Sequence, residues 1–117
     1  MKTKLDKKKP LAPQICEQIC IGIACGTYKT GERMLSVREM AVKAGVNPNT
    51  VQRAYEILEG EGVLYSVRGS GWFVVEDESH SSRIMDKLMK EKTKEYFDTM
   101  DALGMSIDQI KEYVKGW

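Results

Sequence analysis

The sequence predicts a mainly α-helical chain that carries one small β-hairpin. Three observations support this fold class. Apolar residues recur at helical spacing through most of the chain, two of the expected helices are separated by a short turn that contains a glycine, and the spacing changes to that of strands only after residue 62. The expected order is therefore three helices, a hairpin and a helical C-terminal part.

The first expected helix covers roughly residues 12–25. Ile15, Ile19 and Ile23 recur every four residues, which places them on one face of a helix. The first nine residues contain five lysines and are expected to form a flexible basic tail. After the helix, two glycines bracket the segment GTYKTGERM, which is expected to be a turn and a short extended piece.

A second, short helix is expected from the motif SVRE. Ser36 and Glu39 have the spacing of a capping box, in which each side chain binds the backbone N–H of the other residue. Apolar residues follow at helical spacing, and Gly45 is suited to the C-terminal cap because glycine adopts the left-handed conformation easily.

The third expected helix begins two residues after that glycine. Asn47 is expected to cap it, with Pro48 at its first position, and Gly62 is expected to end it. Two helices joined by a short glycine-containing turn form a helix-turn-helix. The residues expected on the buried side of the third helix are Val51, Ala54, Tyr55 and Leu58.

A β-hairpin is expected after the third helix. The runs VLYSV and WFVV have the composition of strands, and the residues between them, RGSG, are typical of a turn. Three helices followed by such a hairpin predict a winged helix-turn-helix domain over residues 10–75.

Residues 76–117 are expected to form a C-terminal helical dimerisation region. The segment EDESHSS is expected to be a linker or a helix cap, and it precedes a long helix, a break near Gly104 and a last helix capped by Ser106. Two short helices cannot bury both of their apolar stripes on each other, so a second copy of the chain is expected to cover them. The residues expected at this homodimer interface are Met85, Leu88, Met89, Tyr96, Phe97, Met100, Ile107, Ile110 and Val114.

Composition limits the classes of protein to consider. A chain of 117 residues with 42% hydrophobic residues allows one small domain and an appended oligomerisation element. No apolar run is long enough to span a membrane or to act as a signal peptide, so a cytoplasmic location is expected. Residues 1–75 hold 11 Lys/Arg against 7 Asp/Glu, a net +4, while residues 76–117 hold 7 against 10, a net −3. The front part is therefore better suited to an anionic partner.

The start of the third helix carries more hydrogen-bonding side chains than capping requires. Asn47 accounts for the cap, but Asn49, Thr50, Gln52 and Arg53 follow within two turns. The second helix of a helix-turn-helix enters the major groove of DNA by its N-terminal residues. Because Asn and Gln can bind adenine and Arg can bind guanine, these residues are predicted to contact an operator in double-stranded DNA.

Two arginines have an alternative role in ion pairs. Arg38 lies in the first turn of the second helix, where it and the free amides of that turn can bind one phosphate, or it can pair with Glu32. Arg53 can contact DNA, or it can pair with Glu56 or Glu39.

The hairpin tip is also predicted to contact DNA. Gly69 and Gly71 allow the backbone to approach a sugar-phosphate surface closely, and Arg68 can reach a phosphate or the minor groove. The alternative is that Arg68, Gly69, Ser70 and Gly71 form only a turn.

Three motifs together carry a resemblance to a known family. GTYKTGERMLSVREMA, GVNPNTVQRAY and RGSGWFV resemble the winged-helix domain of GntR-family transcriptional regulators over residues 10–74, and the short C-terminal part resembles the YtrA-type subgroup. The resemblance implies DNA contacts at Arg38, at the start of the third helix and at the wing tip. It also implies dimerisation through the two C-terminal helices and control of a transporter operon.

The sequence departs from the family pattern at three positions. Many members carry Arg at the positions of Pro48 and Gln52, so the base preference of other members does not transfer to this chain. Trp72 stands where the family usually has Thr, and it is expected to alter the packing of the wing.

Other residues suggest alternatives to plain DNA binding. Cys16, Cys20 and Cys25 are expected to be reduced thiols that fill helical positions, but they can also indicate a thiol- or metal-responsive regulator. His80 is expected to lie at the surface of a polar linker. The methionines of the last 40 or so residues are expected to pack at the dimer interface, and they leave room for a small hydrophobic effector of unknown identity.

The sequence therefore predicts a homodimeric DNA-binding transcriptional regulator, expected to be a repressor acting on a two-fold symmetric operator. No catalytic residue set, cofactor or metal site is expected. A winged-helix module that binds proteins instead of DNA is an alternative. Acidic residues in the third helix would favour it, and residues 47–55 contain none.

Overall fold

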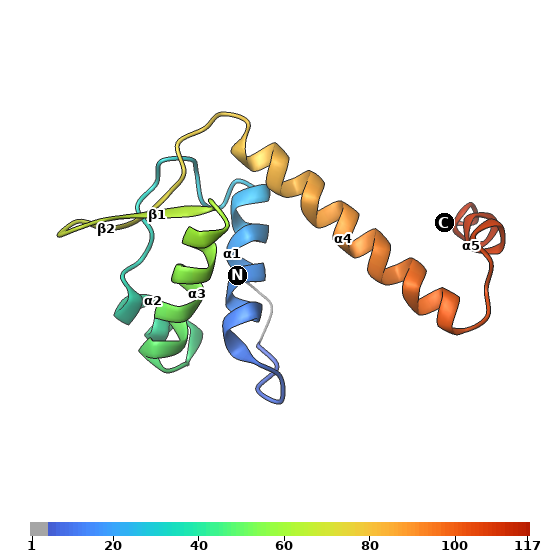
Figure 1. Cartoon of the computed structure of the whole chain (residues 1–117), viewed down its shortest axis with the longest axis horizontal. Helices are drawn as coiled ribbons and strands as arrows, with labels where there is room; N and C mark the ends of the chain where they lie inside the picture. The colour runs from blue at the N-terminus through green and yellow to red at the C-terminus, as the bar shows by residue number, and fades with distance from the viewer. Residues whose placement is uncertain (1–4) are drawn as a thin grey trace. The chain divides into compact units, whose positions relative to one another are not determined.

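The computed structural model describes residues 5–117. Within this range the chain forms five α-helices and one two-stranded antiparallel sheet, in the order α1, α2, α3, β1, β2, α4 and α5 (Figure 1). This confirms the predicted mainly helical fold with a small hairpin. The chain divides into two compact units, unit 1 up to Met85 and unit 2 from Asp86 to Trp117.

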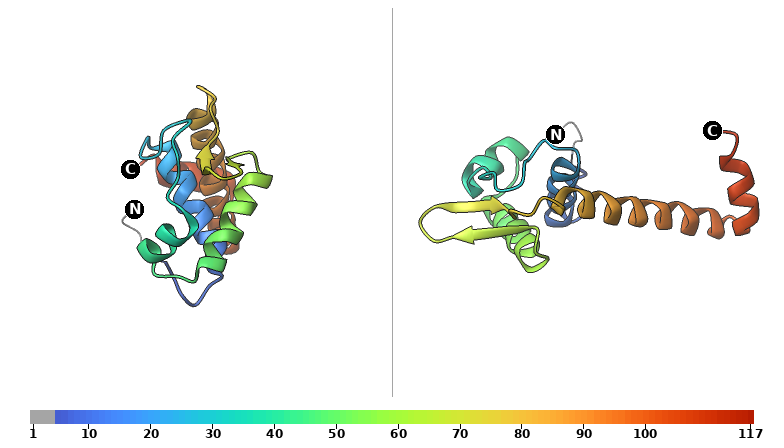
Figure 2. Two further views of the ribbon diagram at one scale, coloured as in Figure 1. Left: turned by 90° about the vertical axis from the view of Figure 1, so that its left-hand side faces the viewer. Right: turned by 90° about the horizontal axis from the view of Figure 1, so that it is seen from above.

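Three helices form the core of unit 1. They are α1 (Leu11–Ala24), α2 (Val37–Ala44) and α3 (Pro48–Gly60). Both α1 and α2 pack against α3, as the two further views in Figure 2 also show. Ile19 and Ile23 on α1 are fully buried, as predicted. The predicted buried residues of α3 are each 0% exposed: Val51, Ala54, Tyr55 and Leu58.

The ends of α2 follow the capping rules that the sequence indicates. The Glu39 N–H donates to Ser36 Oγ at 3.1 Å, and the Ser36 N–H donates to Glu39 Oε1 at 2.9 Å. Hydrogen bonding of the carboxylate to the Ser36 backbone N–H, and to a smaller degree to the Ser36 side chain, lowers the pKa of Glu39. Gly45 adopts φ 69° and caps the C-terminus, which a left-handed residue allows. The helix α3 runs to Gly60, and Gly62 ends it as predicted: Gly62 has φ 74°, its N–H donates to the Glu59 carbonyl at 3.0 Å, and the Val63 N–H donates to the Leu58 carbonyl at 2.9 Å.

The wing consists of β1 (Leu64–Val67) and β2 (Gly71–Val74), paired antiparallel. The extended piece before α2 adds to the edge of this hairpin. Arg33 forms an isolated bridge with Phe73, and the Met34 N–H donates to the Trp72 carbonyl at 2.8 Å. The sequence predicted an extended piece here but not its pairing with β2.

Two aromatic residues connect the wing to the core. The ring of Trp72 meets the ring of Tyr55 edge-on, with centroids 5.5 Å apart. The Tyr55 hydroxyl donates to the Leu35 carbonyl at 2.8 Å. Trp72 therefore anchors β2 on α3, while Tyr55 also holds the segment that leads into α2.

The start of α4 (His80–Ala102) belongs to unit 1, and the predicted surface position of His80 is wrong. His80 is only 4% exposed, and its Nε2 lies 3.1 Å from the Val63 carbonyl oxygen. Asp77 accepts a hydrogen bond from the Ser79 N–H at 2.9 Å and forms an ion pair with Arg83 at 2.8 Å, which lowers the pKa of its carboxyl to about 2. These contacts turn the acidic segment into a helix start and direct His80 inward.

The division between units consequently falls after Met85, whereas the sequence placed it after Val75. His80 and Ile84 are the buried residues of α4. Both lie in unit 1, so the first turns of α4 add to its core.

The predicted flexible tail is also wrong for the residues that the structure describes. Residues 5–9 form a turn that the side chain of Gln14 holds by several hydrogen bonds. Residues 1–4 of the predicted tail lie outside the described residues.

Unit 2 contains the remainder of α4 and α5 (Ile107–Val114). Gly104, with φ 85°, lies in the break between them, and Ser106 forms a capping box with Gln109 at the start of α5. Ion pairs between residues three or four apart line the exposed side of α4, as between Lys94 and Asp98 at 2.7 Å. Within residues 5–117, no helix is both long and apolar enough to cross a lipid bilayer.

Replacing Tyr55 by Phe should lower the free energy of unfolding by about 0.5–1.5 kcal/mol, because the Leu35 carbonyl then loses its hydrogen bond in a partly buried position. Urea denaturation measures this difference. Tyr65→Phe is the matched control, since it removes a hydroxyl that makes only an exposed 3.4 Å contact with Glu76. Equal losses in the two variants would show that the Tyr55 hydroxyl has no special role.

Candidate nucleic-acid interface

The packing of α3 determines which of its side chains reach solvent. Because its apolar side is buried against α1 and α2, the residues between the buried positions point outward. Asn49, Gln52 and Arg53 are exposed, and Thr50 is half-buried. The predicted reading residues therefore lie at the free surface of the first two turns of α3.

Asn47 acts as the N-cap of α3. Its Oδ1 accepts the Asn49 N–H at 2.8 Å, its carbonyl accepts the Thr50 N–H at 2.9 Å, and Pro48 has no N–H. Free amides at a helix start can hold a phosphate, but none of the first three positions of α3 offers one. The capping role of Asn47 occupies the amides, so α3 meets a ligand through side chains.

The start of α2 differs in this respect. Arg38 is exposed, and among residues 5–117 it forms no ion pair, so the alternative pairing with Glu32 is not made. The capping box engages the Glu39 N–H, and no partner in the described chain takes the Val37 and Arg38 amides. The guanidinium and these two amides remain available to one anionic group.

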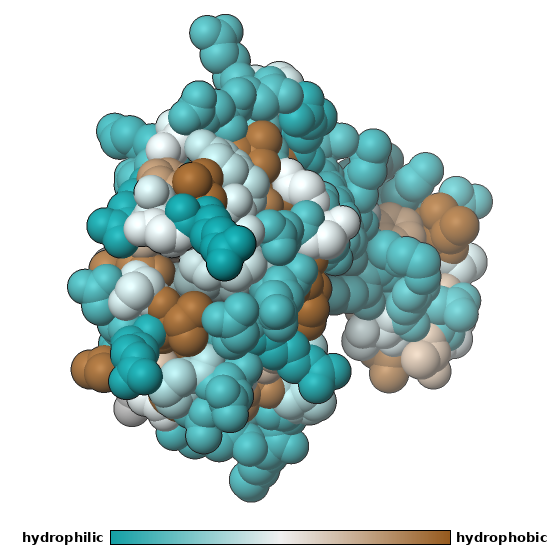
Figure 3. Space-filling model, turned by 60° about the vertical axis from the view of Figure 1, so that its left-hand side comes forward, coloured by the Kyte–Doolittle hydropathy of each residue, from teal (hydrophilic) through white to brown (hydrophobic). Residues whose placement is uncertain are grey.

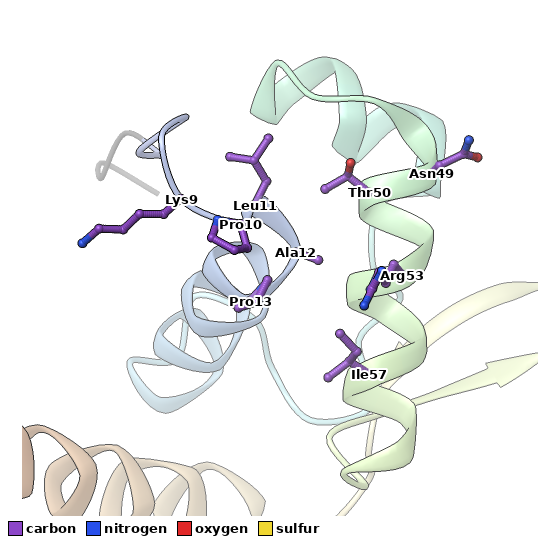
Figure 4. A pocket seen from close by; sticks show the side chains of 9 residues that line it. All are labelled: Lys9, Pro10, Leu11, Ala12, Pro13, Asn49, Thr50, Arg53 and Ile57. Carbon is purple, nitrogen blue, oxygen red and sulfur yellow. The ribbon is translucent and has the colours of Figure 1, made fainter.

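Arg53 is also unpaired within the described part of the chain. The alternative ion pairs with Glu56 and with Glu39 are absent there. Its guanidinium is exposed on the side of α3 that faces α1, as the close view in Figure 4 shows.

The tip of the wing is exposed and tightly turned. The Ser70 N–H donates to the Val67 carbonyl at 2.9 Å, and Gly69 and Gly71 have φ values of 81° and 107°, which disfavour residues with a Cβ. Arg68 is exposed and unpaired among the described residues. Figure 3, which brings the side of unit 1 with the wing forward, shows a mainly hydrophilic surface with separate hydrophobic patches.

Sequence reasoning missed two basic features near these residues. Arg33 lies beside β2, and its guanidinium approaches the wing tip, where its Nε would be 3.4 Å from a Cβ added at Gly71. Lys7 donates from Nζ to the Gly45 carbonyl at 3.0 Å, which places the N-terminal turn beside the turn of the helix-turn-helix. Only the excess of lysine in the first nine residues could have indicated the second feature.

The three cysteines differ in burial. Cys16 is buried, its Sγ–H donates to the Ala54 carbonyl at 3.4 Å, and burial, with a smaller effect of Glu61, raises its pKa to about 11. A raised pKa makes a thiol less reactive. Cys20 is half-buried and Cys25 is exposed. Among residues 5–117, no group of three His, Cys, Asp or Glu side chains could hold a metal ion.

Comparison with known proteins identifies the family of the chain. Residues 11–74, more than half of the chain, match the family described as bacterial regulatory proteins, gntR family. The chain belongs to the GntR family. As a GntR protein it is a transcriptional regulator with a DNA-binding domain, and not an enzyme.

A relative identifies the subgroup. The HTH-type transcriptional repressor YtrA of Bacillus subtilis is 32% identical over 108 residues, which covers 91% of this chain and 82% of YtrA. This GntR protein is therefore of the YtrA type.

Solved structures agree with the fold. A GntR family transcriptional regulator from Listeria monocytogenes is 38% identical, with a TM-score of 0.85 over 97% of this chain and 99% of that chain. The DNA-binding domain of AraR, solved in complex with operator ORX1, is 29% identical, with a TM-score of 0.55 over 64% of this chain and 92% of that chain. GntR regulators bind operators in DNA, and DNA is the partner class of this chain.

Replacing Asn47 by Ala should lower the free energy of unfolding by about 1 kcal/mol, because the Asn49 N–H loses its capping acceptor. Asn47→Asp should change this free energy by no more than a few tenths of a kcal/mol, since Asp caps about as well. Urea denaturation of the two variants provides the measurement. If Asp destabilises as much as Ala, capping is not the main role of Asn47.

Proposed function

We propose that this GntR regulator is a homodimeric repressor that binds a two-fold symmetric operator. The observation that carries the proposal is an exposed polar set on unit 1 whose side chains have no partner among residues 5–117: Arg38, Asn49, Gln52, Arg53 and Arg68. In this arrangement α3 enters the major groove and Arg38 binds the backbone, while the wing tip contacts the flanking sugar-phosphate surface.

Asn49 and Gln52 have the role of reading bases. Both are exposed on α3, and an amide side chain can form two hydrogen bonds with adenine. Asn47 contributes indirectly by fixing the first turn of α3. Pro48 at the first helical position adds no hydrogen-bond donor, so the reading of bases rests on Asn49, Thr50 and Gln52.

Exposed apolar residues in unit 2 support the homodimer. Leu103 is 72% exposed, Tyr113 is 56% exposed and Trp117 is 90% exposed, and sequence reasoning missed all three. With three further residues they line an open hollow of about 590 Å³: Tyr96, Met100 and Val114. A second copy would remove this apolar surface from water, in agreement with the predicted interface.

The predicted dimer residues do not all have the same exposure. Met85, Met89, Tyr96, Ile107 and Val114 are exposed, while Leu88, Phe97 and Met100 are half-buried. Ile110 is only 1% exposed and is covered without a second copy, so we remove it from the proposed interface.

Repression is supported by a relative, since the YtrA protein described above carries the name of a repressor. A regulator of this size represses most simply by occupying the operator. We keep control of a transporter operon as part of the proposal, on the resemblance to the YtrA-type subgroup alone.

Gln52→Ala and Arg38→Ala should affect DNA binding in different ways. On an operator obtained by selection from random duplexes, Gln52→Ala should cost about 1–3 kcal/mol of binding free energy and much less on random DNA. Arg38→Ala should weaken binding to both and reduce the salt slope by about one unit. Fluorescence anisotropy titrations at several salt concentrations measure both quantities. If Gln52→Ala loses equal binding free energy on both DNAs, Gln52 contacts the sugar-phosphate backbone of the DNA and not the bases.

Leu103→Asp should raise the Kd of the dimer by at least about tenfold, because burying a Leu contributes roughly 1.5–3 kcal/mol and about 1.4 kcal/mol corresponds to tenfold. Sedimentation analysis measures the Kd. Ala102→Asp is the matched control, since it adds the same charge at an exposed position on the side of α4 that carries Glu95 and Asp98. A wild-type protein that sediments as a monomer at tens of micromolar would refute the homodimer.

A further inference from the structure

Residues 6–9, which we call the lysine turn, form a fixed structure in front of α1. Gln14 accepts the Asp6 N–H on its Oε1 at 2.7 Å, and its Nε2 donates to the carbonyls of Asp6, Lys9 and Pro10 at 2.8, 3.3 and 3.0 Å. The Lys8 N–H donates to the Asp6 carboxylate at 3.0 Å. Three lysines and one aspartate give the turn a net charge of +2.

Lys7 connects the lysine turn to the helix-turn-helix. Its Nζ donates to the carbonyl of Gly45, the residue that caps the C-terminus of α2, at 3.0 Å. A cation is favourable at the C-terminal end of a helix. The turn is therefore held at two points, on α1 through Gln14 and at the end of α2 through Lys7.

An open groove of about 620 Å³ separates this region from α3. Thr50, Arg53 and Ile57 extend from α3 toward α1, whereas Asn49 points away (Figure 4). No acidic residue lines the groove. Its full lining is Lys9, Pro10, Leu11, Ala12, Pro13, Asn49, Thr50, Arg53 and Ile57.

The basic side chains of the groove have no partner among residues 5–117. Lys9 is exposed, and like Arg53 it forms no ion pair there. Its side chain extends away from α3 in Figure 4, so its ammonium group reaches the groove by rotation about its own single bonds. A separate hollow on α2 and the start of α3 is lined by Arg38 and Pro48. Two distinct hollows thus adjoin the start of α3, each with at least one unpaired cation.

A helix that lies in the major groove has a sugar-phosphate backbone on each of its two sides. Arg38 can contact only one of these two backbones, because a single side chain cannot reach both. The second backbone would meet the groove between the lysine turn and α3.

We propose that Lys9, together with Arg53, binds a phosphodiester of the DNA backbone on the α1 side of α3, and that Gln14 is a positioning residue that fixes the lysine turn for this contact. The proposal rests on the proposed function, since it requires α3 to enter the major groove. It adds a contact to the predicted set at Arg38, α3 and the wing.

The test is the salt dependence of binding to a short random-sequence DNA duplex, measured by fluorescence anisotropy with the full chain. Each lost phosphate contact should reduce the slope of log K against log salt by about 0.9. When salt rises from about 50 to 200 mM, the affinity of both proteins falls, and the factor by which the affinity of Lys9→Ala falls should be about 3.5 times smaller than the factor for the wild type. Lys29→Ala is the matched control, because Lys29 is exposed beyond the far end of α1, a helix about 21 Å long, and should leave the slope unchanged.

Gln14→Ala tests the positioning role without a change of charge. We expect it to weaken binding at every salt concentration while the slope stays at the wild-type value, because Lys9 can still reach the phosphate but the turn must first be ordered. Thermal unfolding of each variant establishes that unit 1 remains folded. A Gln14→Ala variant that is folded and binds as tightly as the wild type would refute the positioning role.

Arg38→Ala separates failure of this inference from failure of the proposed function. If Arg38→Ala flattens the slope and Lys9→Ala does not, the protein binds DNA as proposed but the lysine turn makes no phosphate contact. If Arg53→Ala flattens the slope and Lys9→Ala does not, the contact belongs to α3 alone and the inference is again wrong. A wild type without salt-dependent binding would overturn the proposed function itself.

Discussion

The burial of one side of α3 is the constraint on which the rest of unit 1 depends. Val51, Ala54, Tyr55 and Leu58 are completely covered, and both α1 and α2 pack against the helix that carries them. Because these positions fix the rotation of α3 about its axis, the intervening polar residues have no alternative to the surface. Tyr55 extends the same constraint to the wing through the ring of Trp72. The reading surface and the wing are thus positioned by a single buried face.

The sequence predicted well those features that depend on neighbouring residues. The capping box of Ser36 and Glu39, the cap at Asn47 and the strand runs each need only a few consecutive residues, and the structure contains all of them. Features that depend on distant residues were missed. His80 is buried because Val63, 17 residues earlier, offers it a carbonyl. The lysine turn is ordered because Gln14 and Gly45 bind it, and no local pattern reveals a contact between residues 38 positions apart.

The same distinction applies to the site and to unit 2. Residue types and helical spacing were enough to place Asn49, Gln52 and Arg53 on the exposed side of α3. Arg53 forms no ion pair within residues 5–117, and this depends on side-chain positions that spacing does not determine. In unit 2, spacing alone treated Ile110 and Val114 alike, although the first is buried and the second is 39% exposed. Amphipathic spacing identifies an apolar stripe and does not say which part of it the chain covers by itself.

The two helix starts of the helix-turn-helix differ in the hydrogen-bond donors that they leave to a ligand. At α3, Asn47 and Pro48 leave none of the first three amides free, so a phosphate gains nothing from approaching this end. At α2, the amides of Val37 and Arg38 keep no partner in the described chain, so an anion there meets both amides and a guanidinium. In the proposed complex, a DNA backbone held at α2 leaves the tip of α3 to the base edges. In that proposal Pro48 contributes by bringing no N–H to the first turn of α3, and the cations proposed to bind the backbone lie on either side of this turn.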